Sequence, residues 1–113
     1  MKYLATMEMI ESVLANILAS PQQAVQHVEQ VLKQHEALIK LEMEKKIQIV
    51  GTPVGKKVDM FIVDTPSVEE LNELIMSLPI YAKMNVEVTP LVDFKVQDVK
   101  IRQSLEHLKE TQK

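Results

Sequence analysis

The fold is decided by residues 64–92, which read DTPSVEELNELIMSLPIYAKMNVEVTPLV. Ser67 can cap the start of a helix, and Glu70 lies three residues later, where it completes a capping box. Apolar residues at helical spacing follow, and Pro79 ends the helix because proline cannot continue one. After a short loop, residues 84–89 alternate between apolar and polar side chains, as a half-buried strand does. The stretch therefore predicts the end of a strand, a helix, a sharp stop and another strand.

The chain before this stretch is expected to begin with a strand and a long helix. Residues 2–9 alternate in the manner of a half-buried strand. Residues 10–19 are apolar and ambiguous, and we expect a loop with one turn of helix there. Ser20 and Pro21 begin a helix that we expect to end near residues 44–46. Its expected buried stripe consists of Ala24, Val28, Val31, Leu32, Leu38 and Ile39.

Two further strands are predicted at residues 47–50 and 57–63, and the segment between them holds both glycines of the chain. The second strand is apolar on both sides. One side has Val58, Met60 and Ile62, and the other has Lys57, Asp59, Phe61 and Val63. Two apolar sides indicate a strand that is buried on both. Because a chain of this length has helices for only one side, we expect a partner subunit to cover the other.

The predicted elements follow the order β-α-β-β-α-β, with a weaker third helix over residues 97–111. This is the ferredoxin-like order of an α+β protein. A chain of 113 residues suits a single domain, residues 1–113. Its core is expected over about residues 1–95, followed by a C-terminal helical extension over residues 96–113.

The composition excludes several classes of function. A net charge of −3 offers no field that would attract nucleic acid. The absence of cysteine excludes disulfides, zinc–thiolate sites, iron–sulfur ligation and thiol catalysis. No apolar run reaches the roughly 18 residues of a membrane span, and Glu8 and Glu11 interrupt any signal-peptide core, so we expect a cytoplasmic protein. No glycine pattern for a phosphate or dinucleotide is present, and no cofactor is expected.

Between residues 57 and 91 a strand and a helix are accompanied by three short motifs, namely Asp64-x-Pro66-Ser67, Leu78-Pro79 and Met84-x-Val86-Glu87-Val88. This pattern resembles the C-terminal half of the muconolactone isomerase-like family. The resemblance implies a ferredoxin-like dimeric α+β barrel that assembles into homodimers or larger homo-oligomers. It also implies a cofactor-free isomerase, which moves a carbon–carbon double bond in a small unsaturated lactone or acid by proton transfer.

The chain differs from that family at residues 47–51. The isomerases tend to place Trp, His and Arg in this strand, whereas IQIVG contains no acid or base. The family's usual glycine before the strand is replaced by Lys45 or Lys46. An alternative to the isomerase is therefore a non-catalytic small-ligand-binding or assembly module of the same fold. A cofactor-independent oxygenase of the wider dimeric-barrel superfamily is a third hypothesis, which rests on fold analogy alone.

His35 is the first candidate for proton transfer, because it falls within the apolar stripe of the long helix and imidazole titrates near neutral pH. The competing interpretation is a histidine at the edge of the core that is bonded to a backbone carbonyl. Glu42 lies two turns later on nearly the same face, and Glu36 is adjacent in sequence. Either carboxylate could orient the imidazole or act as the base, although such glutamates are more often solvated.

Substrate-binding candidates are Tyr3, Tyr81 and Lys57. A tyrosine hydroxyl can bond an enolate oxygen, although Tyr3 also fits a core strand and Tyr81 an exposed loop. Lys57, like Lys56, could neutralise a substrate carboxylate or protect a strand edge from aggregation. His27 and His107 lack further ligands at suitable spacing, so no metal site is predicted and both are expected to be solvated surface residues.

Overall fold

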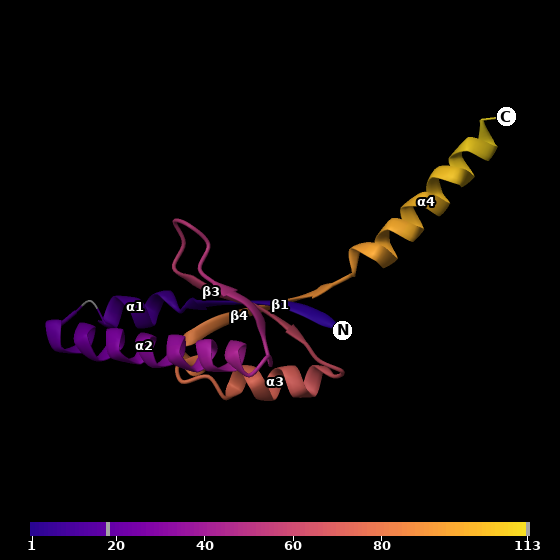
Figure 1. Cartoon of the computed structure of the whole chain (residues 1–113). Coiled ribbons are helices and arrows are strands. Elements are labelled where there is room, and N and C mark those ends of the chain that lie inside the picture. The colour runs from indigo at the N-terminus through magenta and orange to yellow at the C-terminus, as the bar shows by residue number, and fades with distance from the viewer. Residues whose placement is uncertain (18, 113) are drawn as a thin grey trace.

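The computed structural model describes residues 1–17 and 19–112, and it contains one four-stranded antiparallel sheet whose strands run in the order β2-β3-β1-β4 (Figure 1). This ferredoxin-like topology confirms the predicted α+β class. In chain order the elements are β1 (Lys2–Met9), α1 (Glu11–Ile17), α2 (Pro21–Met43), β2 (Gln48–Gly51), β3 (Val58–Asp64), α3 (Val68–Met76), the 3-10 turn η1 (Tyr81–Lys83), β4 (Met84–Leu91) and α4 (Phe94–Thr111).

Both predicted helix starts are present, and each is capped by a serine that bonds a backbone N–H three residues later. The Ser20 Oγ accepts a hydrogen bond from the Gln23 backbone N–H at 3.1 Å, and Pro21 opens α2. The Ser67 Oγ accepts from the Glu70 N–H at 3.2 Å at the start of α3. Each bond satisfies a backbone donor that a helix leaves unpaired at its first turn.

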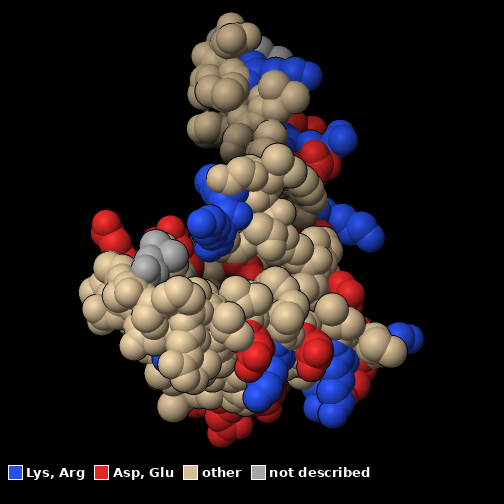
Figure 2. Space-filling model, turned by 90° about the vertical axis from the view of Figure 1, so that its left-hand side faces the viewer, with Lys and Arg blue, Asp and Glu red and all other residues tan. Residues whose placement is uncertain are grey.

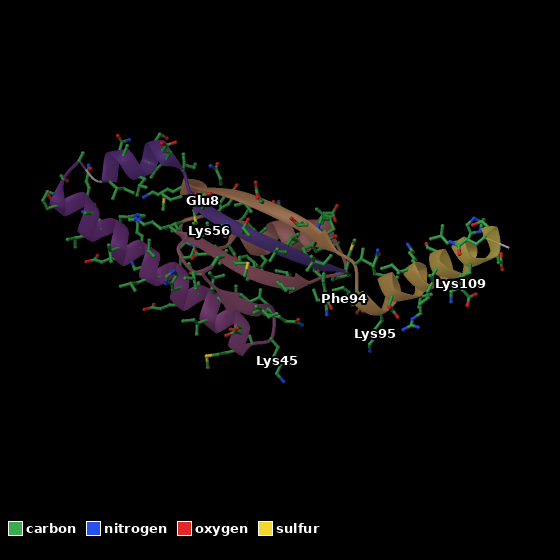
Figure 3. All side chains as sticks on the ribbon, turned by 90° about the horizontal axis from the view of Figure 1, so that it is seen from above. Glu8, Lys45, Lys56, Phe94, Lys95 and Lys109 are labelled. Atoms are coloured by element: carbon green, nitrogen blue, oxygen red, sulfur yellow. The ribbon has the colours of Figure 1, made fainter. Side chains whose placement is uncertain are left out.

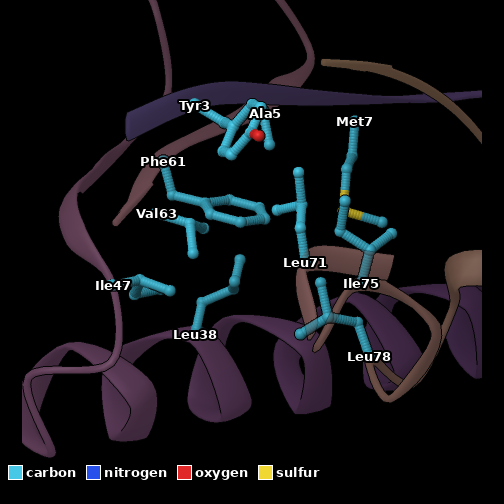
Figure 4. Close-up of a cluster of buried hydrophobic side chains, with 10 residues drawn as sticks. All are labelled: Tyr3, Ala5, Met7, Leu38, Ile47, Phe61, Val63, Leu71, Ile75 and Leu78. Atoms are coloured by element: carbon cyan, nitrogen blue, oxygen red, sulfur yellow. The ribbon is translucent and has the colours of Figure 1, made fainter. Parts of the chain in front are cut away.

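The hydrophobic core lies between the sheet and helices α2 and α3 (Figure 4). Phe61 of β3 is at its centre and has no exposed surface. Ala5 of β1 pairs directly with Phe61, which brings the two central strands onto the same helical layer. The other core members are Tyr3, Met7, Leu38, Ile47, Val63, Leu71, Ile75 and Leu78.

The alternation predicted for β3 is confirmed by its register. Met60 pairs with Thr6 and Ile62 pairs with Leu4, on the side of the sheet away from Phe61. These side chains remain half-buried in the single chain, whereas Phe61 and Val63 are fully buried under the helices. The second apolar side therefore exists, and the partner subunit that would cover it remains a prediction.

The predicted apolar stripe of α2 is only partly buried in the structure, so the prediction of one buried stripe was wrong. Only Gln34 and Leu38 of this helix are buried, whereas Val28, Leu32 and Ile39 are 55%, 54% and 51% exposed. The predicted stripe spans more than a quarter of the helix circumference, and the sheet covers just one edge of it. The exposed edge becomes a second apolar surface, which points away from the core.

Two segments also differ from expectation near the chain ends. Residues 10–19, predicted as a loop with one turn of helix, contain a longer helix, α1, which runs for seven residues from Glu11 to Ile17; residue 18 lies outside the described residues. Helix α4 begins at Phe94, earlier than expected, because the Asp93 side chain caps it by accepting from the Lys95 N–H at 2.8 Å.

Helix α4 projects from the body of the molecule (Figures 1 and 2). None of its residues is buried, and it contributes to the molecule's extent of 72 Å along the longest axis. Over the described residues, no helix combines the length and the apolarity needed to cross a bilayer.

Candidate functional site

A cavity of about 490 Å³ opens at one end of the sheet. It lies where α1, α2, the end of β1 and the start of β3 meet, beside the residues that lead into β4. Figure 3 shows Glu8 and Lys56, two of its lining residues, at this end and α4 at the other. Most of the lining is apolar and consists of Met9, Leu14, Val28, Val31, Leu32, Val58, Ile80 and Met84.

The side chains of His35 and Asp59 meet at the edge of this cavity. The His35 Nε2 lies 3.3 Å from the Asp59 Oδ1, and the side chains are 45% and 14% exposed. The imidazole comes from α2 and the carboxylate from the start of β3, so tertiary packing brings them together. A carboxylate beside one ring nitrogen can orient an imidazole, which suits a group that exchanges protons.

A buried glutamine holds the carboxylate in place. Gln34 has no exposed surface, and its Nε2 donates to the second oxygen of Asp59, Oδ2, at 3.1 Å. Its Oε1 accepts from the Ile80 backbone N–H at 3.2 Å. Because one side chain bonds both β3 and the segment before η1, Asp59 and the cavity wall keep a common position relative to α2.

The polar part of the lining includes Lys56, Lys57 and His27. Neither lysine is paired with a carboxylate among the described residues, so both cations are available to a bound anion. The Nδ1 of His27 is buried and has no hydrogen-bond partner within the described chain. This position corrects the prediction that His27 is a solvated surface residue, because α1 and the cavity wall shield it from solvent.

The structure places two of the six predicted site residues, His35 and Lys57, in the cavity lining. The other four lie outside it. Glu36 is exposed, and the Glu42 Oε2 accepts from the Val50 backbone N–H at 3.3 Å. Tyr3 is a core residue, and Tyr81 is half-buried in η1 against the core.

Three lining or supporting residues were not candidates in the predicted site, namely Gln34, Asp59 and His27. Asp59 had a signal in the sequence, because it is an acid on the Phe61 side of an otherwise apolar strand. Gln34 had none, since a glutamine in a polar helix looks like a surface residue until its partners are known. In the described part of the chain, no three His, Asp or Glu side chains gather as metal ligands.

Comparison with known proteins agrees with this architecture. Residues 1–97 match the family model of muconolactone delta-isomerase. A crystal structure of muconolactone isomerase superposes with a TM-score of 0.62 at 23% sequence identity, and the match covers 82% of this chain and 90% of that one. No curated protein matches the sequence. The family model spans most of the chain, and this protein therefore belongs to the muconolactone delta-isomerase family.

Proposed function

We propose that the protein is a cofactor-free isomerase that moves a double bond in a small unsaturated lactone or acid by proton transfer at His35. The observation that carries the proposal is the His35–Asp59 pair at an apolar cavity. A volume of about 490 Å³ lies within the range of small-molecule sites. Membership of the isomerase family supports the reaction class.

The proposed reaction begins with neutral His35. Because Asp59 lies 3.3 Å from Nε2, Nδ1 is the nitrogen left to act as the base. It takes a proton from the saturated carbon at one end of the unsaturated system, which is either next to the carbonyl or on the far side of a double bond conjugated with it. The electron pair of the broken C–H bond moves into the conjugated system and places negative charge on the carbonyl oxygen. The imidazolium then returns a proton to the far carbon of that system, which moves the double bond and restores neutral His35.

Three neighbouring groups support this chemistry. Asp59 stabilises the imidazolium while it holds the extra proton. Lys56 and Lys57 can balance the charge of a substrate carboxylate or of the enolate oxygen.

The alternative is a non-catalytic small-ligand-binding or assembly module. Its support was the lack of an acid or base at residues 47–51. These residues are outside the cavity lining, and β2 is at the opposite edge of the sheet from β4. The His35–Asp59 pair comes from α2 and β3 and does not depend on ionisable groups at residues 47–51. We therefore favour the isomerase over the non-catalytic module.

We also propose that two copies pair through the side of the sheet that carries Leu4, Met60 and Ile62. Its support is a half-buried apolar surface on the two central strands. Light scattering at micromolar concentration is expected to show an oligomer. Ile62→Asp should weaken it, because the interface would bury an unpaired charge. A wild-type monomer would overturn this pairing.

The first test of the reaction is an NMR time course with muconolactone and related enol lactones in deuterated buffer. We expect isomerisation or deuterium incorporation, with rates at least about 10²-fold lower in His35→Gln and in Asp59→Asn. His107→Gln is the matched control, because His107 lies on α4, outside the cavity lining. Turnover that is unchanged in His35→Gln would overturn the assigned role, and silence across the panel would favour the binding module.

A further inference from the structure

Two helices of this chain carry apolar stripes that nothing in the described chain covers. On α4, Phe94, Ile101, Leu105 and Leu108 are 88%, 57%, 51% and 59% exposed. On α2, the outward edge consists of Val25, Val28, Leu32 and Ile39, which are 58%, 55%, 54% and 51% exposed. In both stripes, successive apolar residues are three, four or seven positions apart. This spacing places them in a narrow line along the helix, which is typical of helices that pack side by side.

Helix α4 needs a partner for its stability. It has 18 residues and no buried side chain. Most helical stability in proteins comes from the packing of an amphipathic face, and α4 has such a face with nothing packed against it among the described residues. Residues 98–111 also lie beyond the segment that matches the family, so this surface is a feature of the present chain.

We infer that α4 of one copy packs antiparallel along the outward edge of α2 in a second copy. The contact joins two different surfaces, so each copy can offer both. It is separate from the pairing proposed for the open side of the sheet.

The chain's own α4 cannot make this contact. Only Val92 and Asp93 join α4 to β4, which is the edge strand farthest from β2 in the sheet. The C-terminal part of α2, which carries Ile39, packs beside β2 at the opposite edge, where Glu42 accepts from the Val50 N–H. The two edge strands are about 14 Å apart at the usual strand spacing, whereas two residues span about 7 Å at most.

In one register of the antiparallel pair, every apolar residue of the α2 stripe faces an apolar residue of the α4 stripe. It places Val25 against Leu108, Val28 against Leu105, Leu32 against Ile101, and Ile39 against Phe94. The single polar layer it creates puts His35 opposite Asp98, two polar side chains that are 45% and 59% exposed. Sliding α4 by one heptad in either direction would instead place Asp98 against Val28 or against Glu42. Each of those neighbours is unfavourable for a carboxylate.

The charged flanks select the orientation and the partner. Lys95, Arg102 and Lys109 follow one flank of the α4 stripe, and Glu29 and Glu36 follow the corresponding flank of α2. In an antiparallel pair these flanks meet, which brings Glu36 near Lys95 and Glu29 near Arg102. Two α4 helices packed antiparallel on each other would bring their basic flanks together. Lys33 and Lys40 of α2 lie farther from the stripe, and Arg102 already bonds Asp98 at 2.8 Å within α4.

The contact would also complete the candidate site. Val28, Leu32 and His35 belong both to the α2 stripe region and to the cavity lining. A second copy's α4 along this edge would cover the mouth of the cavity. This consequence rests on the proposed function, whereas the helix contact itself does not.

The test is disulfide cross-linking in the full chain, which has no native cysteine. A tagged Val25→Cys chain and an untagged Leu108→Cys chain are mixed and oxidised. We expect a mixed disulfide dimer that forms at least about tenfold faster than with Glu110→Cys, since residue 110 faces the other side of α4 at almost the same height. Cross-linking no faster than this control, or Leu108→Cys chains that link mainly to each other, would overturn the inference.

A charge exchange tests the register. Glu36→Lys and Lys95→Glu, each in one of the cysteine-bearing chains, should slow cross-linking by about two- to fivefold, and together they should restore it. Recovery of the cross-linking rate in the doubly changed pair is the decisive result. If either substitution acted only by disturbing its own helix, the slower rate would persist when both are present. Two slowing effects that add would overturn this register. Neither readout depends on turnover, so failure of the helix contact and failure of the proposed reaction are distinguishable.

Discussion

The core around Phe61 and the projecting helix α4 use apolar residues in opposite ways. Phe61 has no exposed surface and lies among side chains from β1, α2 and α3, whereas Phe94 on α4 is 88% exposed. Both residues belong to regular elements with clear sequence patterns. The comparison teaches that apolar periodicity predicts a helix or strand and its apolar side. Whether the same chain buries that side depends on where the connecting segments place the element.

The largest expected effect comes from truncating the two phenylalanines. Phe61→Ala should lower the free energy of unfolding by about 3–5 kcal/mol, because it leaves a cavity in the core. Phe94→Ala is the matched control and should change the stability of the dissociated chain by less than about 0.5 kcal/mol. Urea denaturation at low protein concentration measures both. Equal losses would mean that Phe94 is buried within its own chain.

A smaller effect is expected where a polar side chain supports the core. Gln34→Ala should cost about 1–3 kcal/mol, because it leaves Asp59 and the Ile80 N–H without their buried partner. Gln26→Ala, on the exposed part of the same helix, should be nearly neutral. Thermal unfolding of both variants compares them directly. A neutral Gln34→Ala would show that water replaces the glutamine without loss.

The smallest effect should be a gain in stability at the end of α2. The Lys45 N–H bonds Glu42 O, and the Lys46 N–H bonds Leu41 O, which is the Schellman pattern. Lys45 has φ 63°, a conformation that favours glycine. Lys45→Gly should therefore raise the free energy of unfolding by about 1 kcal/mol. Lys46→Gly is the control, and an equal gain there would contradict the assignment.

Much of the fold could be predicted because its signals are local. Ser20, Ser67 and Pro79 act on backbone groups within a few residues, so their sequence neighbours suffice to place the helix ends. Lys45 follows the same logic, since its positive φ and the cap hydrogen bonds around it involve only residues 41–46. Residues 10–19 were misjudged for the opposite reason, because a short apolar segment has no periodicity long enough to separate helix from loop.

The candidate site was only partly predictable. His35 and Lys57 were found because their residue types and neighbours suggested chemistry. Asp59 was recognised as a strand residue, but its pairing with His35 joins positions from different elements. Glu36 and Glu42 shared the neighbourhood of His35 along the helix, yet the packing of α2 on the sheet turned neither into the cavity lining.

The sequence by itself determined the ferredoxin-like order, the capped helices and the two apolar sides of β3, because these depend on periodicity and on contacts within a few residues. Only the tertiary structure decided that Gln34 is buried, that Asp59 meets His35, and that half of the α2 stripe faces outward. Those outcomes depend on how α2 lies across the sheet, and such an angle is set by the combined packing of residues that are distant in the chain.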